Sequence, residues 1–352
     1  MTAYRVGIIG TGRPWKSEGA TGFGMAHAHA QAYQANEGCT IVAVADIVEE
    51  HARAFAEQYG VPEIYTDYQK MLAEAQLDIV SICTWPALHA DMVKNAARAG
   101  VKAIHCEKPM ATTWSDAQSM ASVCAELGVQ LTFNHQRRFN KPFRVARELL
   151  QSGAIGKLER MEGNCGNLYD WGTHWFDMFS FFNNETRAKW VMGQIDRRTD
   201  QSIFGVKLED SGLSYIAYEN GVYALMVTGD PLESGLGGRA IRLLGDAGTI
   251  EIWWEAPHVR VRSNGETEWR IIDENESIHD FAAIARGVGD IVESLRTGRE
   301  SELSARRALI ATEIIFATYE SSRRRARVDL PLTISDSPLQ ALIESGELGP
   351  KS

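Results

Sequence analysis

The feature that most constrains this sequence is a glycine loop directly after its first apolar segment. YRVGIIGTG (4–12) has the pattern of a short strand that runs into Gly10 and Gly12, and a helical pattern begins near Gly24. Glycines suit a turn whose backbone approaches a pyrophosphate closely, while the following helix offers unpaired N–H groups and the positive end of its dipole. Residues 13–23 separate the third glycine from the first two, so the spacing is unusual. On this motif alone, an ordinary glycine-containing loop is an equally good interpretation.

Strand patterns and helical patterns alternate over residues 5–133, which predicts a parallel sheet covered by helices on both faces. Helices are expected to end at Gly60, Gly100 and Gly128, because glycine readily takes the left-handed conformation that closes a helix. Asp67 is placed to cap a further short helix. The expected strands are residues 6–9, 40–45, 78–83, 101–106 and 129–133.

The alternation stops near Asn134, which we take as a domain boundary. Residues 1–134 are predicted to form a dinucleotide-binding domain with a doubly wound parallel sheet. Residues 135–352 are predicted to form a substrate-binding α/β domain with a large, open and mainly antiparallel sheet, because strand patterns now follow one another. The predicted fold class is therefore α/β.

Three patterns support this second domain. SYIAYE and VYALMV flank Asn220-Gly221, a dipeptide suited to a type I′ hairpin turn. The segments 249–255 and 258–262 alternate apolar and polar residues, so one face of the sheet is buried and the other is open. A long helix is expected over residues 305–322, with Ala308, Ala311, Ile315 and Tyr319 on the face that packs on the domain.

Charge and cysteine usage exclude several classes of protein. The formal net charge is 36 − 46 = −10, the wrong sign for gripping phosphate backbones, so nucleic acid is not an expected partner. The five cysteines are scattered without a C-x-x-C pair, which favours reduced thiols over a zinc site or a disulfide framework. The sequence shows no signal-like segment and no apolar run of membrane-spanning length. We therefore expect a cytoplasmic protein without a membrane partner.

Asp46 is the first candidate for a specific contact to a cofactor. It ends the second expected strand, 22 residues after Gly24, where an acidic side chain binds the ribose hydroxyls of NAD and repels a 2′-phosphate. The alternative is a structural role, since Asp46 with Glu49 three residues later resembles a capping box. No arginine follows immediately, so NAD is favoured over NADP.

Lys108 lies in the Glu107-Lys108-Pro109 turn after a buried strand, at the carboxyl edge of the predicted sheet where ligands collect. A lysine there can polarise a substrate oxygen, and its charge helps a hydroxyl lose its proton as hydride departs. A solvated loop lysine is the alternative for any lone lysine. The position in the sheet favours the catalytic interpretation.

Asp170, His174 and Asp177 are spaced so that a helix would place all three on one face. Such a group can transfer protons, bind a metal or form a structural carboxylate–imidazole pair, and no further ligands suggest a metal. A buried, satisfied histidine is an equally good interpretation of this motif alone. Tyr169 and the two neighbouring tryptophans could offer faces to a sugar ring, although core packing explains them equally well.

Together these motifs resemble the glucose-fructose oxidoreductase and inositol dehydrogenase family (Gfo/Idh/MocA). RVGIIGTG, MAHAHAQAY, VAVAD, DIVSICTWPALHADMVKNAARAG, HCEKPMA and DWGTH occur in the family's order over nearly the whole chain. The resemblance implies an N-terminal Rossmann domain, and a C-terminal α/β domain whose open sheet often serves oligomerisation. It also implies NAD(P)-dependent oxidation or reduction of a sugar or cyclitol, and a homodimer or homotetramer.

The resemblance assigns roles to individual residues. The implied catalytic set is Lys108, His174 and Asp170. The implied cofactor contacts are Gly10, Gly12, Gly24, Asp46, Thr84, His89, Glu107 and Lys108, and no metal is implied. NHQRRF (134–139) would lead into the substrate pocket, where the expected contacts are Arg138, Tyr169, Asp170 and His174. The sequence departs from the family pattern at the insertion 13–23 and at Trp85, where a smaller polar residue is usual.

The expected activity is oxidation of a secondary hydroxyl of a sugar, sugar derivative or cyclitol by hydride transfer to NAD. His174 would accept the hydroxyl proton, Lys108 would polarise the oxygen, and Asp170 would fix the substrate and the imidazole. One alternative is NAD-dependent glycoside cleavage through transient oxidation and elimination, and another is a non-catalytic NAD(P)-sensing regulator. The insertion, with Arg13 and Lys16, is expected either to fold over the pyrophosphate or the pocket mouth, or to form a disordered surface bulge.

Overall fold

The computed structural model describes residues 3–20, 22–229, 237–272 and 275–350. The chain divides into two compact units. The first comprises residues 1–112, 116–136 and 281–308, and the second comprises residues 113–115, 137–280 and 309–352. The sequence analysis places one boundary after Asn134, whereas residues 281–308 return to the first unit late in the chain.

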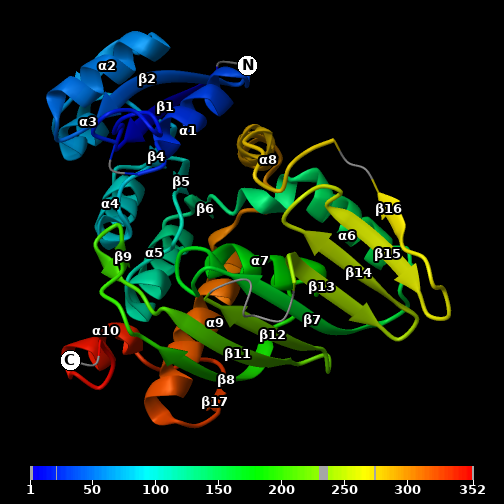
Figure 1. The fold of residues 1–352 in the computed structure, drawn as a ribbon. Helices are drawn as coiled ribbons and strands as arrows, with labels where there is room; N and C mark the ends of the chain where they lie inside the picture. The colour runs from blue at the N-terminus through cyan, green and yellow to red at the C-terminus, as the bar shows by residue number, and fades with distance from the viewer. Residues whose placement is uncertain (1–2, 21, 230–236, 273–274, 351–352) are drawn as a thin grey trace. The chain divides into compact units, whose positions relative to one another are not determined.

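The first unit contains a six-stranded sheet in the order β3-β2-β1-β4-β5-β6 (Figure 1). All neighbouring strands are parallel, so this is the doubly wound sheet predicted from the alternating pattern. The strands are β1 (Tyr4–Ile9), β2 (Cys39–Ala45), β3 (Glu63–Tyr65), β4 (Ile79–Ile82), β5 (Ala103–Cys106) and β6 (Gln130–Phe133). The helices are α1 (Met25–Gln34), α2 (Glu49–Tyr59), α3 (Tyr68–Glu74), α4 (Pro86–Arg98), α5 (Trp114–Glu126) and α8 (Ala282–Thr297).

Local chemistry explains where several of these helices begin and end. Asp67 caps α3 as predicted, because its carboxylate accepts the Gln69 N–H at 2.8 Å. Gly60 ends α2 in the left-handed conformation, with φ of 67°. The short edge strand β3 was not predicted, because three residues are too few for a clear alternating pattern.

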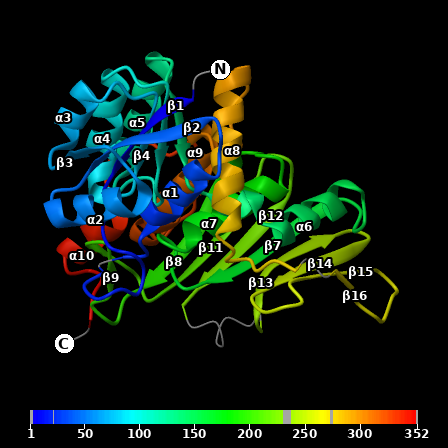
Figure 2. The ribbon, with the colours of Figure 1, turned by 90° about the horizontal axis from the view of Figure 1, so that it is seen from above.

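The segment 281–308 belongs to the first unit because it bonds to the edge strand β6. The Phe133 N–H donates to the Leu303 carbonyl at 2.9 Å, and Thr132 forms an isolated bridge with Ser304. Helix α8 from this segment packs beside α1 (Figure 2). The alternation of strand and helix patterns cannot predict that residues 281–308 belong to the first unit, because these contacts join residues far apart in the sequence.

The second unit contains a nine-stranded sheet in the order β16-β15-β14-β13-β7-β12-β11-β8-β17 (Figure 1). Only the pairing of β7 with β12 is parallel among these described strands, so the predicted mainly antiparallel sheet is confirmed. The strands are β7 (Leu158–Cys165), β8 (Ala188–Asp196), β11 (Ser211–Tyr218), β12 (Tyr223–Thr228), β13 (Arg239–Gly245), β14 (Gly248–Trp253), β15 (Val259–Ser263), β16 (Arg270–Ile272) and β17 (Val328–Asp329). A separate hairpin joins β9 (Ser202–Ile203) to β10 (Val206–Lys207).

Helices cover one face of the large sheet. They are α6 (Lys141–Gln151), α7 (Gly172–Phe182) and α9 (Ala305–Arg324), with α10 (Pro338–Glu344) near the chain end and a 3₁₀ turn, η1 (Gln136–Phe139), before α6. All eleven residues of α7 are buried. The predicted face of α9 is confirmed, because Ala308, Ala311, Ile315 and Tyr319 are all buried.

The opposite face of the sheet is open. Met192, Leu213, Tyr215 and Tyr223 are exposed at alternating positions on β8, β11 and β12. The rings of Tyr215 and Tyr223 stack at 5.5 Å with an interplanar angle of 11°. On β14 and β15, where alternation was predicted, Ile250, Ile252, Val259 and Val261 are buried and Thr249, Trp253, Arg260 and Arg262 are partly exposed, whereas Glu251 is also buried.

The hairpin between β11 and β12 is confirmed, but its predicted type I′ turn is wrong. A type I′ turn needs positive φ at both Asn220 and Gly221. Only Gly221 has a positive φ, at 85°, and the Tyr218 N–H donates to the Val222 carbonyl at 2.9 Å. The loop therefore has three residues instead of the two of a type I′ hairpin, and Gly221 is its left-handed last residue. This is a common form of hairpin loop.

Candidate active site

The three glycines of the first loop have distinct physical roles. A Cβ on Gly10 would lie 2.7 Å from Thr84 Cγ2 and 3.0 Å from the Cys83 carbonyl oxygen, so the segments that follow β1 and β4 approach too closely for a side chain. Gly12 has φ of +55° and no atom within 4 Å of a Cβ position, which leaves open space beside the loop. This open backbone before α1 suits a pyrophosphate.

Gly24 is the residue directly before α1, with φ of 61°. A Cβ there would meet the backbone of the insertion, 2.7 Å from Trp15 N and 2.9 Å from the Arg13 carbonyl oxygen. Gly24 is therefore required because the inserted segment passes directly against the start of the helix. The usual spacing of the three glycines does not predict this close contact, because it describes a loop without an insertion.

The inserted segment has its own bonded structure in its described residues. Arg13 Nε lies 3.1 Å from His51 Nε2, and Nη1 donates to the Glu18 carbonyl at 2.8 Å. The rings of Trp15 and Phe23 lie 6.0 Å apart, and Lys16 Nζ lies 4.2 Å from the Trp15 ring. These contacts hold residues 13–20 together, while a contact to the cofactor stays a prediction.

Asp46 connects the end of β2 to the glycine loop. Its Oδ2 accepts the Gly12 N–H at 2.9 Å and the Thr11 hydroxyl at 3.0 Å, and Oδ1 accepts the Val48 N–H at 2.9 Å. The predicted capping box with Glu49 does not form, because Val48 is the residue that precedes α2 and Glu49 already lies inside the helix. The carboxylate therefore lies beside the open loop, which fits a dinucleotide whose ribose needs an acidic partner.

Glu107 organises the turn that carries Lys108. Its Oε1 accepts from His29 Nε2 at 2.9 Å and from Asn134 Nδ2 at 2.7 Å, and its Oε2 accepts the Lys108 N–H at 3.2 Å. The carboxylate is buried, so it contributes through these bonds and not as an exposed cofactor ligand. The Lys108-Pro109 bond that follows is cis.

His29 and Glu107 form a buried ion pair. Nδ1 of His29 lies 2.6 Å from the Ser81 hydroxyl oxygen. Burial opposes the charge, but the Cys83 sulfur and the Glu107 carboxylate raise the pKa of His29. Burial likewise opposes the carboxylate, but His29, Lys108 and Asn134 lower the pKa of Glu107. Both groups are therefore charged near neutral pH.

His89 braces the same turn from α4. Its side chain is fully buried, with Nδ1 3.0 Å from the Pro109 carbonyl oxygen and Nε2 3.1 Å from the Thr84 carbonyl oxygen. Burial lowers the pKa of His89, so the ring is neutral and donates to one of these carbonyls at a time. We interpret His89 as support for the loops after β4 and β5. The Thr84 hydroxyl donates to Met92 Sδ at 3.4 Å.

Asp170 precedes α7, so the prediction that Asp170, His174 and Asp177 share one helical face is wrong. The helix begins at Gly172, and the Asn167 side chain accepts the Asp170 N–H at 2.7 Å. This side chain competes for the backbone donors that a helix would otherwise use, and it fixes a turn instead. His174 and Asp177 remain one turn apart on α7, and all three side chains are buried.

Arg138 is a brace within the second unit. Nε and Nη2 donate to the two Asp177 carboxylate oxygens, each at 2.8 Å, and Nη1 donates to Glu185 at 2.8 Å. The guanidinium is buried in this ion triad, so the predicted substrate contact by Arg138 is not supported. Tyr169 is also buried, in a cluster with Val206 and Leu208, which favours core packing over a face for a sugar ring.

Sequence reasoning missed three residues of these networks. Ser81 on β4 and Asn134 directly after β6 bond to the His29–Glu107 pair. Arg137 lies beside Arg138 in the same four-residue turn but has no carboxylate partner in the described chain. A pattern of two adjacent arginines does not distinguish their surroundings, since successive side chains point in different directions.

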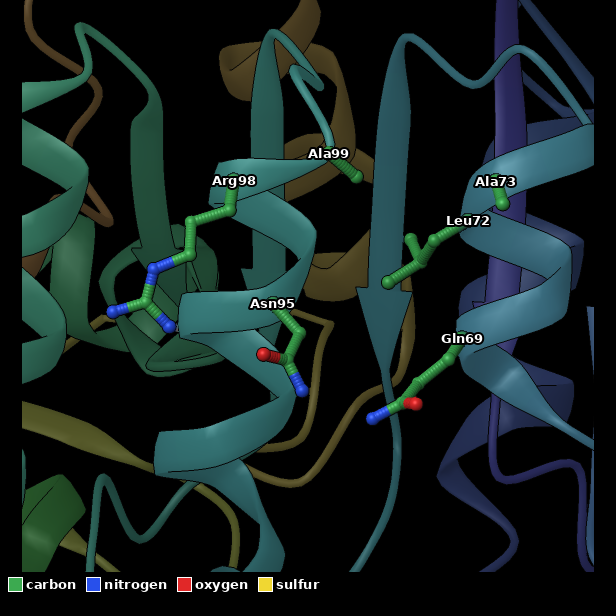
Figure 3. A pocket seen from close by; sticks show the side chains of 6 residues that line it. All are labelled: Gln69, Leu72, Ala73, Asn95, Arg98 and Ala99. Carbon is green, nitrogen blue, oxygen red and sulfur yellow. The ribbon is translucent and has the colours of Figure 1, made fainter.

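We also searched the described residues for a further pocket, a metal site and a membrane-spanning helix. The hollow of about 460 Å³ in Figure 3 lies between α3 and α4, where Gln69 and Leu72 face Asn95, and no predicted site residue lines it. Within the described ranges, no group of three His, Cys, Asp or Glu residues is arranged to hold a metal. No helix in those ranges has the length and apolar character needed to cross a membrane.

Comparison with protein families gives matches for both parts of the chain. A family model described as an oxidoreductase family with an NAD-binding Rossmann fold matches residues 4–135. A second model, of the C-terminal alpha/beta domain of this oxidoreductase family, matches residues 159–330.

Individual proteins show the same similarity. D-apiose dehydrogenase of Paraburkholderia graminis is 27% identical over 352 residues, covering 90% of each chain. Inositol 2-dehydrogenase of Rhizobium meliloti is 35% identical over 155 residues, covering 44% of this chain and 43% of its own length. The structure of levoglucosan dehydrogenase with NADH and L-sorbose has a TM-score of 0.79 at 19% identity, covering 95% of this chain and 100% of that chain. At that identity the structural likeness supports the fold alone.

Proposed function

The chain belongs to the Gfo/Idh/MocA oxidoreductase family, and on this premise we propose that it oxidises a secondary hydroxyl of a sugar, sugar derivative or cyclitol. It is an NAD-dependent oxidoreductase that acts on CH–OH groups. NAD, when bound, supplies the acceptor for the hydride that leaves the carbinol carbon. The observation that carries the proposal is the Lys108 turn, anchored by a buried carboxylate at the carboxyl end of β5.

The protein groups manage the proton and the oxygen in this proposal. His174 accepts the hydroxyl proton, Lys108 polarises the oxygen as hydride departs, and Asp170 orients the substrate and the imidazole. The Lys108 backbone is held by Glu107, and the Asp170 backbone is held by Asn167. Both residues thus stand on turns fixed by buried side chains, which supports roles that need precise positioning.

The cofactor residues follow from the loop geometry. Gly12 leaves the backbone open to a pyrophosphate, Gly10 lets the loop pass close to Thr84, Gly24 precedes the helix, and Asp46 serves the ribose hydroxyls. An acidic side chain at that point disfavours the extra phosphate of NADP by charge repulsion.

The test is substrate-dependent formation of NADH, followed by absorbance over a panel of sugars and cyclitols. Lys108→Ala and His174→Ala should each lower turnover on the true substrate about 100-fold or more, the usual size of a general acid–base contribution. Lys102→Ala is the matched control, because Lys102 precedes the same strand and pairs with Asp78 on the surface. Wild-type turnover in both site variants would show that the assigned roles are wrong.

The open face of the nine-stranded sheet is the proposed surface for self-association. Exposed apolar side chains of β8, β11 and β12 lie on that face, and Arg160, Glu162, Arg242 and Glu251 pair on its other half. A patch with both apolar and paired charged regions can meet a second copy of itself across a two-fold axis. A homodimer or homotetramer is therefore the proposed assembly.

A cytoplasmic location is also proposed. All five cysteines are free thiols, at Cys39, Cys83, Cys106, Cys124 and Cys165. Free thiols are typical of reducing compartments, because oxidising ones favour disulfides.

A further inference from the structure

The second unit buries a cation, Arg137, that forms no ion pair with a carboxylate of the described residues. Arg137 is 5% exposed, and its Nη1 donates to the Ile278 carbonyl at 2.5 Å. Nη2 lies 3.4 Å from His279 Nδ1, and Nε has no hydrogen-bond partner. Within the described ranges no carboxylate forms an ion pair with Arg137, whereas the adjacent Arg138 is paired with two.

This arrangement is costly if Arg137 is only a structural brace. A guanidinium has five N–H donors, and holding one carbonyl needs a single donor. Removing an unpaired charge from water costs several kcal/mol in real proteins. The ring of Trp175, 4.6 Å from the guanidinium carbon, and the ring of Trp171, at 5.9 Å, offset part of this cost through cation–π attraction. The donors that remain point to a ligand.

Aromatic rings surround the guanidinium and reach the surface. Trp254 stacks on Trp175 with ring centres 4.9 Å apart, and His279 stacks on Trp254 at 5.8 Å. Trp171 and Trp254 are partly exposed and His279 is exposed, so the cluster is open at its rim. The Trp254 indole N–H also lacks a partner.

His279 presents a further donor. Partial burial of the ring, with Arg137 and His258 nearby, lowers the pKa of His279 to about 4, so its ring is neutral near pH 7. Nδ1 faces an arginine donor and therefore accepts, which places the proton on Nε2. Burial lowers the pKa of Arg137 to about 9, opposed by Cys165 and Asp170, so the guanidinium stays charged. Trp171, whose ring lies 5.9 Å from the Arg137 guanidinium carbon, directly follows Asp170 in the chain.

We propose that Arg137, Trp254 and His279 form a carboxylate-binding subsite, and that the substrate is a sugar acid. This deepens the proposed function and rests on it, because Asp170 belongs to the proposed catalytic set. One planar guanidinium with two single N–H donors matches the two oxygens of a carboxylate, while the tryptophan faces suit the C–H face of a sugar ring. A phosphate group, with more charge, would call for further cations.

The test is isothermal titration of the NAD-bound protein with matched pairs of acid and neutral sugar. The probes are D-glucuronate against D-glucose, D-galacturonate against D-galactose, and D-gluconate against D-sorbitol. At least one acid should bind about tenfold or more tightly than its neutral partner, since a charge-assisted bond contributes about 1.5–3 kcal/mol. Arg137→Gln should remove that preference, Arg137→Lys should restore part of it, and Trp254→Phe should weaken acid binding alone.

Arg262→Gln is the matched control, because Arg262 stacks on Trp269 elsewhere in the same unit, with 4.7 Å to the ring centre. Circular dichroism and NAD affinity show whether Arg137→Gln is folded. If it is not folded, the effect of Trp254→Phe on acid binding tests the subsite instead. The subsite is refuted if no acid binds better than its neutral partner, if Arg137→Gln weakens both equally, or if glucose 6-phosphate binds better than the acids.

Failure of the subsite and failure of the proposed function give different results. Titration needs no turnover, so Arg137-dependent acid binding without NADH formation would refute only the proposed dehydrogenase activity. NADH formation from neutral sugars, without a preference for acids, would refute only the subsite.

Discussion

Nε2 of His29 lies 2.9 Å from Oε1 of Glu107, and both side chains are buried. The second oxygen of the same carboxylate accepts the Lys108 N–H at 3.2 Å. Helix α1, which begins at the glycine loop, therefore helps to fix the turn that carries the proposed catalytic lysine. Helix α1 and the turn that carries Lys108 are thus connected through one ion pair.

Removing one partner of this pair should destabilise the protein strongly. We expect His29→Gln to lower the free energy of unfolding by about 3–5 kcal/mol, because it leaves the Glu107 charge buried without its cation. His27→Gln on the same helix is the control, since His27 bonds to the Tyr59 hydroxyl at 3.1 Å and to no carboxylate among the residues that the structure describes. Urea unfolding measures the difference. Equal losses in the two variants would contradict a special role for the pair.

The same pair predicts how stability depends on alkaline pH. The pKa of His29 is raised from 6.5 to about 10, so its contribution is complete below pH 6.5 and is lost as pH rises toward 10. The pKa of Glu107 is lowered from 4.5 to about 2, so its contribution is complete above pH 4.5 and is lost as pH falls toward 2. Unfolding free energies between pH 6.5 and 10 should fall in the wild type and stay flatter in His29→Gln. A slope that is unchanged by the substitution would count against this assignment.

Asp46 should determine the affinity for NAD. We expect Asp46→Ala to weaken NAD binding about tenfold, because charge-assisted bonds to the ribose are lost, while NADP binding weakens less. Asp67→Ala is a matched control, because Asp67 caps a helix in the same unit. Fluorescence titration with both nucleotides gives the two affinities. If both variants lose the same affinity, the effect on NAD is only structural.

Glu209 should give the protein a stability slope at mildly acidic pH. Its carboxyl group is buried, and it accepts from the Tyr319 hydroxyl at 2.8 Å and from the Leu168 N–H at 2.5 Å. Burial raises its pKa from 4.5 to about 7, so the folded protein binds the proton more tightly and stability falls as pH rises through this window. We expect Glu209→Gln to flatten the slope between pH 4.5 and 6.5, below the range affected by His29. Glu219→Gln, on an exposed turn, should leave the slope as in the wild type.

The open sheet face should control the assembly of the protein. We expect Tyr215→Glu to shift sedimentation toward a smaller species, because it places a charge beside the stacked Tyr223 ring in the apolar half of the face. Leu127→Glu is the control, since Leu127 is an exposed apolar residue of the first unit. A wild-type protein that sediments as a monomer would refute the proposal that this surface serves self-association.

Several local features could be predicted from the sequence because their causes are local. Glycine can take the left-handed conformation at Gly60, and the Asp67 carboxylate reaches the next helix from its own position in the chain. Apolar periodicity likewise gave most strands of the first unit and the buried face of α9. The strand β3 and the return of residues 281–308 had no such local signal.

The sequence alone determined the class of fold, the glycine loop and the family, because these depend on short-range periodicity and on motifs whose order along the chain is visible. Only the tertiary structure decided which polar side chains pair with one another. It joined His29 to Glu107 across 78 positions, placed Asp170 outside α7, and separated the paired Arg138 from the unpaired Arg137. The physical reason is that the partner of a buried charge comes from a distant strand or helix. Whether two such groups lie within bonding distance is set only when the chain is packed.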